Sequence, residues 1–355
     1  MRVKISGYVV FYLHKISSFS HEISFIRKIS RAKIISYHRN SKYREAGKVK
    51  KQKEKLLGKE IKKYHQLLLM MIPAIVFFII FAYIPMYGVV LAFKDFRIMD
   101  GIMASPWVGL KYFKKAFEDP YFLKTIENTL IISFGKLIFG FPLPILFAVL
   151  LNEIRGSKFR KFVQTVSYLP HFMSWVILGS IFFSLLSLGG PINSILDFFG
   201  LEKIMFMGNS DVFRQVLIVT DVWKGFGWGS VLYLAAIAGI DQEMYEAAKV
   251  DGANRLHNII YITLPTILPV ICINLILNLS GILNAGFDQV FNMYSETVYD
   301  VADIIDTYVY RIGLKSMQYS LSTAVGLFKS GIGLFMIIIV NFIIGKIGGK
   351  ENTLW

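Results

Sequence analysis

Three lysines lie within long apolar stretches of this chain, where a cation is uncommon. Lys136 and Lys329 are the only charged residues of their stretches. Lys224 shares its stretch with Arg214 and with Asp221, the sole acid in any of the apolar stretches. A charge at membrane depth is costly and commonly marks the path of a polar solute. An ammonium group has three donors for the hydroxyl or carboxylate groups of such a solute. The candidate pathway residues are Lys136, Lys224, Lys329, His171, Trp175, Trp223, Trp228 and Asn284.

The three lysines differ in their expected depth. At about 1.5 Å per helical residue, Lys136 lies roughly 11 Å from the outer end of its predicted span, Lys329 roughly 14 Å and Lys224 roughly 18 Å. Lys224 is the strongest candidate, because the membrane surface is hardest to reach from the greatest depth. Two plainer interpretations stay open. A lysine can pair with another subunit, and Trp and Asn side chains also anchor helices at interfaces or join them.

The motifs of membrane enzymes and nucleotide-binding proteins do not occur in the sequence. There is no G-x-x-x-x-G-K-[ST], no H-E-x-x-H and no G-x-S-x-G, and the six histidines are scattered. We therefore expect no catalytic residues, no metal ligands and no cofactor bound by this chain. ATP and Mg²⁺ would be used by a partner protein.

A polar segment, 241–265, separates two apolar stretches and includes YEAAKVDGANRLHNIIYITLP. Asp241 is suited to cap a helix over 242–250, because its carboxylate can accept from the free N–H groups of the first turn. Gly252 follows, and glycine commonly ends a helix.

A second short helix is expected over 255–263, with Asn254 as its cap and Pro265 where the chain turns or kinks toward the next apolar stretch. The helix-Gly-helix element would present Tyr245, Glu246 and two alanines to the solvent. It is either a docking site for another protein or an ordinary solvated loop.

The elements that position these residues are predicted to be membrane helices. Of the 355 residues, 54% are hydrophobic and only 18% charged, and the mean hydropathy is +0.52. A helix needs about 20 apolar residues to cross a bilayer. Apolar runs of that length predict an all-α polytopic membrane protein with six transmembrane helices, at about 67–93, 129–151, 162–188, 212–240, 264–287 and 320–344.

The charge of the chain is concentrated at one end. Residues 1–65 contain 18 Lys and Arg against 4 Glu, while the formal net charge of the whole chain is +15. Because basic segments stay on the cytoplasmic side, we expect a cytoplasmic tail (1–65), a transmembrane domain (66–346) and a short cytoplasmic C-terminal tail (347–355). The tail would lie beside membrane lipid, and no nucleic-acid partner is expected.

The polar segment also resembles a known motif. Glu246, Ala247 and Ala248, then Gly252, then Ile262 to Pro265 match the EAA-x3-G-x9-I-x-LP loop of binding-protein-dependent ABC importer permeases. Other stretches are similar to LplB-type polysaccharide permeases, among them FPLPILFAVLLNE (141–153), DVWKGFGWGSVLYLAAIAGID (221–241) and VYDVADIIDTYVYRIGL (298–314). The resemblance covers residues from about 64 to the C-terminus.

This resemblance implies a type I, MalF/MalG-like fold in the bacterial plasma membrane and a role in carbohydrate import. The EAA loop would couple the chain to a cytoplasmic ATPase dimer, with a similar second permease and an extracytoplasmic solute-binding (lipo)protein completing the transporter of an oligosaccharide. The implied coupling residues are Tyr245, Glu246, Ala247, Ala248, Asp251, Gly252, Ala253, Leu264 and Pro265.

Other functions are weighed against this one. A permease for another solute class would have the same loop. A stand-alone secondary carrier or channel is disfavoured by the shortage of acids within the spans, and a membrane enzyme of lipid or glycan synthesis by the missing catalytic clusters. The residues leave open which sugar is carried, and whether it is acidic or neutral.

Overall fold

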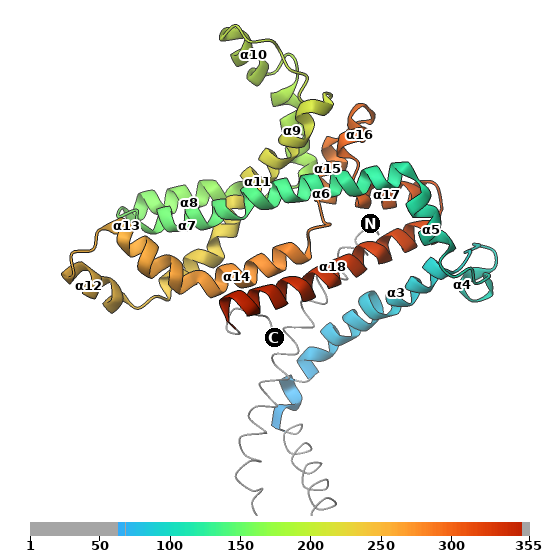
Figure 1. Cartoon of the computed structure of the whole chain (residues 1–355), viewed down its shortest axis with the longest axis horizontal. Helices are drawn as coiled ribbons and strands as arrows, with labels where there is room; N and C mark the ends of the chain where they lie inside the picture. Colours follow the sequence, from blue (N-terminus) through green and yellow to red (C-terminus); the bar gives the residue numbers. More distant parts are fainter. Residues whose placement is uncertain (1–62, 68, 350–355) are drawn as a thin grey trace, which may run out of the picture. The chain divides into compact units, whose positions relative to one another are not determined.

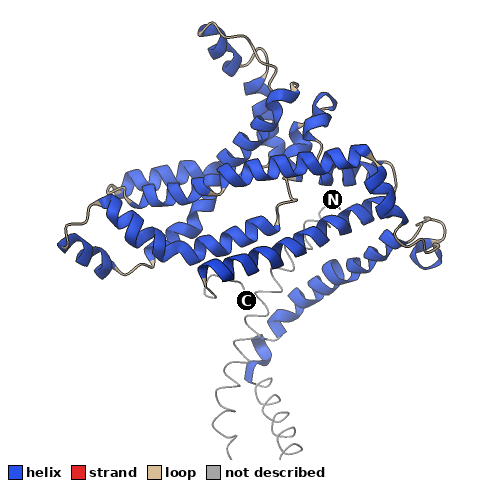
Figure 2. Ribbon diagram, in the orientation of Figure 1, coloured by secondary structure: helices blue, strands red, loops and turns tan. Residues whose placement is uncertain are grey.

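The computed structural model describes residues 63–67 and 69–349, and it divides into two compact units, Met1–Leu91 and Ala92–Trp355. The predicted tail 1–65 lies outside the described residues except at its end, as do residues 350–355 of the predicted C-terminal tail. Within the described part of the chain, every named element is helical (Figure 2). The prediction of an all-α protein is therefore confirmed.

Five helices of the described residues are long and apolar enough to cross a membrane. They lie within or overlap five of the six predicted spans, although their bounds differ from the predicted ones. The number of spans and the cytoplasmic location of the termini remain predictions. The five helices are Leu69–Phe93, Pro120–Asn152, Trp175–Phe198, Arg255–Ser280 and Tyr319–Lys346.

The predicted span 162–188 is wrong as a single helix. The chain forms α8 (Ser157–Phe172) and α9 (Trp175–Leu186), with Ser174 between them in an extended conformation. The Ser174 hydroxyl accepts a hydrogen bond from the Ile177 N–H, so the serine caps α9. Hydropathy is averaged over many residues, so it does not reveal a single capping serine within an apolar run. The apolar stretch continues instead into α10 (Pro191–Phe198).

The predicted span 212–240 forms one long helix, α11 (Ser210–Ala238), of 29 residues. Asn209 caps its first turn. This helix carries Arg214, Asp221 and Lys224, and it is not among the five apolar helices. It packs against α6 (Pro120–Gly140), α7 (Pro142–Asn152) and α8, and Figure 1 shows it crossing these helices.

The helix after the polar segment starts earlier than predicted. Residues Arg255–Ser280 form one continuous helix: α13 (Arg255–Asn258), the π-helix η3 (Ile259–Thr263) and α14 (Leu264–Ser280). The second helix is therefore not a short separate one, and the chain does not turn at Pro265. Pro265 has no N–H and its ring clashes with the carbonyl four residues earlier, which the wider π-turn accommodates.

The same local arrangement occurs in the first unit. There the π-helix η1 (Ile79–Tyr83) stands immediately before α3 (Ile84–Met86), and Pro85 lies four residues after Phe81. The 3₁₀-helix η2 (Tyr87–Phe93) follows. Proline therefore explains both departures from the regular helix.

The predicted span 264–287 ends earlier than expected. Helix α14 stops at Gly281, and Gly286, with φ of +91°, precedes α15 (Phe287–Met293). A left-handed backbone favours glycine, since other residues pay a steric cost there. Helix α18 (Tyr319–Gly348) packs beside α14 (Figure 1).

Shorter elements connect these helices. Two of them, α4 (Gly101–Ala104) and α5 (Lys111–Glu118), precede α6. The others lie between α15 and α18: η4 (Glu296–Val298), α16 (Tyr299–Ala302), α17 (Ile305–Tyr310) and η5 (Arg311–Lys315).

A buried carboxylate fixes the segment between α15 and α18. Asp303 is fully buried and accepts hydrogen bonds from the Arg311 guanidinium at 2.6 and 3.2 Å, from the Tyr121 hydroxyl at 2.7 Å and from the Thr307 hydroxyl at 2.7 Å. Although burial opposes its charge, the hydrogen bond to Asp303 and its negative charge raise the pKa of Arg311. The Asn128 amide of α6 binds the Asp303 carbonyl at 3.1 Å.

We expect Arg311→Met to destabilise the protein strongly. The substitution keeps the bulk of the side chain but leaves the Asp303 carboxylate buried without a cation, which typically costs about 3–5 kcal/mol. Thermal unfolding of the purified chain in detergent measures the loss. Lys315→Met, which removes the basic residue of the last turn of η5, serves as the control and should change stability little. Equal melting temperatures for Arg311→Met and the parent would contradict the account of this cluster.

Candidate functional site

The polar segment forms a helix with a cap at each end, α12 (Gln242–Val250). Asp241 accepts from the Glu243 N–H at 3.0 Å, as predicted for its cap. At the other end the Ala253 N–H donates to the Ala248 carbonyl at 2.9 Å and the Gly252 N–H to the Lys249 carbonyl at 3.2 Å. These two bonds form a Schellman motif, and Gly252 adopts the left-handed φ of +81° that this motif requires.

The next helix also begins as predicted. Asn254 accepts from the His257 N–H at 2.9 Å and so caps α13. Asp251 is the C-cap residue that follows α12, and Ala253 lies between Gly252 and the cap of the next helix. Leu264 packs into the apolar cluster around Tyr233 and Ile267, where α14 begins.

The residues of α12 divide between two faces. Glu246 and Ala247 are exposed, and Val250 is 88% exposed. Tyr245 differs from the prediction because it points inward: it packs into the cluster around Tyr233 and Ile267, and its hydroxyl lies 2.9 Å from the Thr263 hydroxyl. The outer face therefore presents Glu246 and Ala247 to a partner, while Tyr245 attaches α12 to the π-turn before α14.

Lys136 uses all three of its donors within the chain. Its ammonium donates to the Ala285 carbonyl at 2.7 Å and to the Gln289 side-chain oxygen, and it lies 3.3 Å from the Asp221 carboxylate. An ammonium has no fourth donor to offer a solute. Lys136 instead satisfies the backbone where α14 has ended and α15 has not begun.

We expect Lys136→Met to destabilise the fold rather than to weaken solute binding alone. The substitution leaves the Asp221 charge, the Ala285 carbonyl and the Gln289 oxygen without their partner. Because the Asp221 side chain is 36% exposed, we expect a loss of about 1–3 kcal/mol. The double variant Lys136→Met/Asp221→Leu removes both charges and should recover part of the lost thermal stability in detergent. A double variant no more stable than Lys136→Met would argue against this pairing.

Lys329 is also paired. Its ammonium lies 2.6 Å from each oxygen of Asp306, and both side chains are nearly buried, with exposed fractions of 11% and 14%. This pair joins α18 to α17. Carboxylates of the same chain therefore neutralise both Lys136 and Lys329, and a contact of either lysine with a solute stays a prediction.

Lys224 is the exception among the three lysines. Its ammonium lies 4.6 Å from the centre of the Trp175 ring, and among the described residues it has no carboxylate within 4.0 Å and no hydrogen bond. His171 stacks on Trp228 with ring centres 4.8 Å apart and planes 8° apart. We name Lys224, Trp175, His171 and Trp228 the lysine–aromatic cluster.

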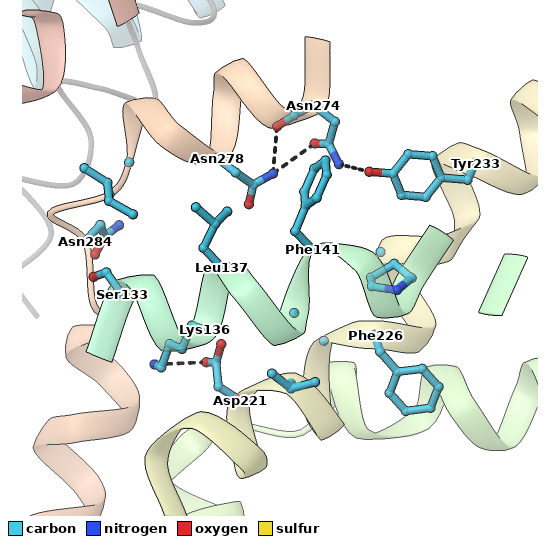
Figure 3. Close-up of a pocket in the computed structure, with 17 residues that line it drawn as sticks. Ser133, Lys136, Leu137, Phe141, Asp221, Phe226, Tyr233, Asn274, Asn278 and Asn284 are labelled. Carbon is cyan, nitrogen blue, oxygen red and sulfur yellow. Dashed lines mark hydrogen bonds and ion pairs between the residues drawn. The ribbon is translucent and has the colours of Figure 1, made fainter. Parts of the chain in front are cut away.

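A polar cavity of about 370 Å³ lies on another side of α11. Helices α6, α7, α11 and α14 line it, and Figure 3 shows side chains from several of them pointing into it. We name it the amide cavity. Its polar lining residues are Ser133, Lys136, Asp221, Tyr233, Asn274, Asn278 and Asn284.

The amide cavity combines satisfied and unsatisfied polar groups. The Asn274 amide donates to the Tyr233 hydroxyl at 2.6 Å, and Asn278 donates to the Asn274 carbonyl at 2.8 Å (Figure 3). The Ser133 hydroxyl is buried and has no partner among the described residues.

Several residues of the amide cavity were not predicted. Asp221, Gly225, Gly229 and Tyr233 recur every fourth residue on α11 and so share one helical face. A Cβ at Gly225 would meet no atom within 4 Å, so this glycine leaves open space. Two glycines flanked by polar residues at a spacing of four are a signal in the sequence that could have indicated this face. Asn274 and Asn278 show the same spacing on α14.

The structure therefore separates the predicted pathway residues. Lys136 and Asn284 line the amide cavity, and four others form the lysine–aromatic cluster. Trp223 packs edge-on against Phe182 of α9, with ring centres 5.6 Å apart, and Lys329 lies with Asp306. Among the described residues, no group of three or more His, Cys, Asp or Glu could hold a metal ion.

Comparison with known proteins gives consistent results. Residues 140–348 match a family described as binding-protein-dependent transport system inner membrane component. The chain is 46% identical over 300 residues to the polygalacturonan/rhamnogalacturonan transport system permease protein YteP of Bacillus subtilis (strain 168), covering 84% of this chain and 94% of YteP. It is 44% identical to the protein LplB of the same organism, covering 81% of this chain and 90% of LplB.

Solved structures are also similar. A chain of a bacterial ABC transporter involved in the import of the acidic polysaccharide alginate aligns with a TM-score of 0.76 at 40% identity, covering 82% of this chain and 99% of that chain. The alginate transporter in complex with its alginate pentasaccharide-bound periplasmic protein gives a TM-score of 0.75 at 39% identity, covering 81% of this chain and 97% of that chain.

Proposed function

This chain belongs to the binding-protein-dependent transport system inner membrane components, and from that membership we propose that it is the permease subunit of an ATP-driven importer of oligosaccharides or polysaccharides. It is a multi-pass protein of the bacterial inner membrane. The relatives named for polygalacturonan/rhamnogalacturonan transport and for alginate import support a carbohydrate as the solute.

One observation carries this proposal: along the chain, α12 stands between α11 and α14, two of the four helices that line the amide cavity. Helix α12 follows α11 and precedes α13–α14, and both α11 and α14 contribute residues to the amide cavity. A force applied to α12 therefore acts on two of the helices that line the amide cavity. Tyr245 strengthens this link, because its hydroxyl binds Thr263 at the start of α14.

The proposed partners follow from the same arrangement. The exposed face with Glu246 and Ala247 would rest on an ATPase, Glu246 meeting a basic residue and Ala247 allowing close approach. A second permease would complete the pathway, and a solute-binding protein would deliver the saccharide. The alginate transporter crystallised with its periplasmic protein supports this last partner. In this arrangement α12 and the two termini lie in the cytoplasm and six helices cross the membrane.

Recovery of the complex tests the assembly. The chain with an affinity tag is purified from its own host in mild detergent, and the recovered proteins are identified by mass spectrometry. We expect an ATPase and a second permease, and we expect deletion of the gene to remove growth on at least one oligosaccharide. The proposed function would be refuted if the chain were recovered without any ATPase and the deletion strain still grew on every oligosaccharide.

A further inference from the structure

Lys224 lies at the middle of α11, one of the six helices proposed above to cross the membrane. It is the fifteenth residue of this 29-residue helix, so at about 1.5 Å per residue each end lies roughly 21 Å away. A lysine side chain is far too short to bring its ammonium to either membrane surface from that depth. Its charge must therefore be compensated near the middle of the helix.

Among the described residues, no carboxylate contacts the Lys224 ammonium and so compensates its charge. Lys136 and Lys329 each lie within 3.3 Å of a carboxylate, whereas none of the carboxylates that the structure describes lies within 4.0 Å of Lys224. Asp221 and Asp288 act on Lys224 electrostatically without contacting it, and Asp221 is already paired with Lys136. A cation left against lipid at this depth would be costly. Lys224 therefore faces a polar pathway or another molecule.

The neighbours of Lys224 are suited to a sugar ring. Trp175 lies under its ammonium, and the stacked pair of His171 and Trp228 stands beside it on the same side of α11. Trp228 is 44% exposed, so part of its ring is free for contact. Aromatic surfaces bury the apolar face of a pyranose, while an ammonium with free donors binds an anion most strongly.

We propose that the lysine–aromatic cluster binds a carboxylated sugar unit, with Lys224 pairing with the carboxylate, so that the substrate is an acidic oligosaccharide. The proposal rests on the function proposed above and adds the chemical class of the solute. The amide cavity contains the balanced pair of Lys136 and Asp221 and recognises hydroxyl groups. Charge recognition thus belongs to Lys224 alone among the three lysines.

The test measures uptake by the complete transporter in proteoliposomes that enclose ATP. The binding protein is the same in every assay, so a difference between variants arises in the permease. The probes are oligogalacturonate, oligoglucuronate and oligomannuronate, each compared with its methyl ester, which is neutral and nearly the same shape. We expect the parent to prefer at least one acid over its ester.

Three variants test whether Lys224 causes the preference for the acid over its ester. Lys224→Gln should lower the acid-to-ester ratio of uptake rates at least about tenfold, the effect of losing roughly 1.4 kcal/mol. Lys224→Arg keeps the charge and should retain most of the preference. Asp288→Asn, which removes a nearby charge that does not contact Lys224, should retain it too. Binding of each complex to the loaded binding protein confirms that the variants are assembled.

Other results would refute either the acidic class of the substrate or the proposed function itself. If the parent imports esters or neutral oligosaccharides as fast as acids, or if Lys224→Gln keeps the full preference, the acidic class is refuted while the proposed function stands. The same holds if Lys224 proves to pair with a carboxylate of the second permease in the assembled complex. If the parent complex imports no saccharide at all, the proposed function itself fails.

Discussion

Replacement of Glu246 by lysine is expected to abolish the stimulation of ATP hydrolysis by substrate-loaded binding protein. Glu246 is exposed on the outer face of α12, within a helix whose two ends are fixed by Asp241 and by the Schellman motif at Gly252. Reversing one charge of a close ion pair at an interface costs at least about 2–5 kcal/mol, because like charges then meet. Stimulation should fall by roughly 30-fold or more. It is measured as phosphate release by the purified complex.

The control for this variant is Glu202→Lys. It makes the same substitution in an exposed loop before α11, at the opposite end of that helix from α12. Its ATP hydrolysis should remain close to that of the parent. Because Glu246 and Glu202 are both exposed, neither substitution should disturb the fold, and the melting temperatures of the two variants should agree. Normal stimulation in Glu246→Lys would remove α12 from the coupling interface.

Replacement of Gly225 by leucine is expected to block saccharide uptake without unfolding the chain. A Cβ at Gly225 meets no atom within 4 Å, so the fold has room for the new side chain. That room belongs to the amide cavity of about 370 Å³, beside Asp221 and Gly229. A leucine there would occupy the space and the polar surface that a sugar requires, and we expect the initial rate of uptake to fall at least about tenfold, which needs a loss of only about 1.4 kcal/mol.

Gly331→Leu is the matched control for this prediction. Gly331 lies on α18, also has open space around its Cβ position, and does not line the amide cavity. Both variants add the same bulk to a helix that is already formed. Thermal unfolding should show both to be folded, and uptake should be lost only in Gly225→Leu. Unimpaired uptake by a folded Gly225→Leu protein would place the pathway elsewhere.

The helix caps and the turn of the polar segment could be predicted almost completely from the sequence. The caps at Asp241 and Asn254 and the turn at Gly252 form as the residue types indicate, since each depends only on nearby backbone groups. The apolar runs predict that helices exist but not where they break. Ser174 caps the start of a new helix inside an apolar run, whereas Pro265, which suggested a turn, is accommodated by a π-helix.

The pairing of the lysines could not be predicted because it depends on partners distant in the sequence. Asp306 lies outside every predicted span and yet meets Lys329, and Lys136 meets a carbonyl and an amide more than a hundred residues away. The ranking of Lys224 first among the three lysines rests on its depth in the predicted span and stays a prediction. The amide cavity was missed because its signal, glycines and polar residues at a period of four, appears only when small residues are counted together with charged ones.

The central claim is that this chain moves a saccharide only when a partner hydrolyses ATP. The most direct measurement is the initial rate of oligosaccharide uptake into proteoliposomes that contain the purified complex, with ATP enclosed and loaded binding protein outside. We predict uptake that stops when ATP is replaced by a non-hydrolysable analogue, and none with this chain reconstituted alone. Sustained uptake by this chain alone, without ATP, would contradict the account and identify a secondary carrier.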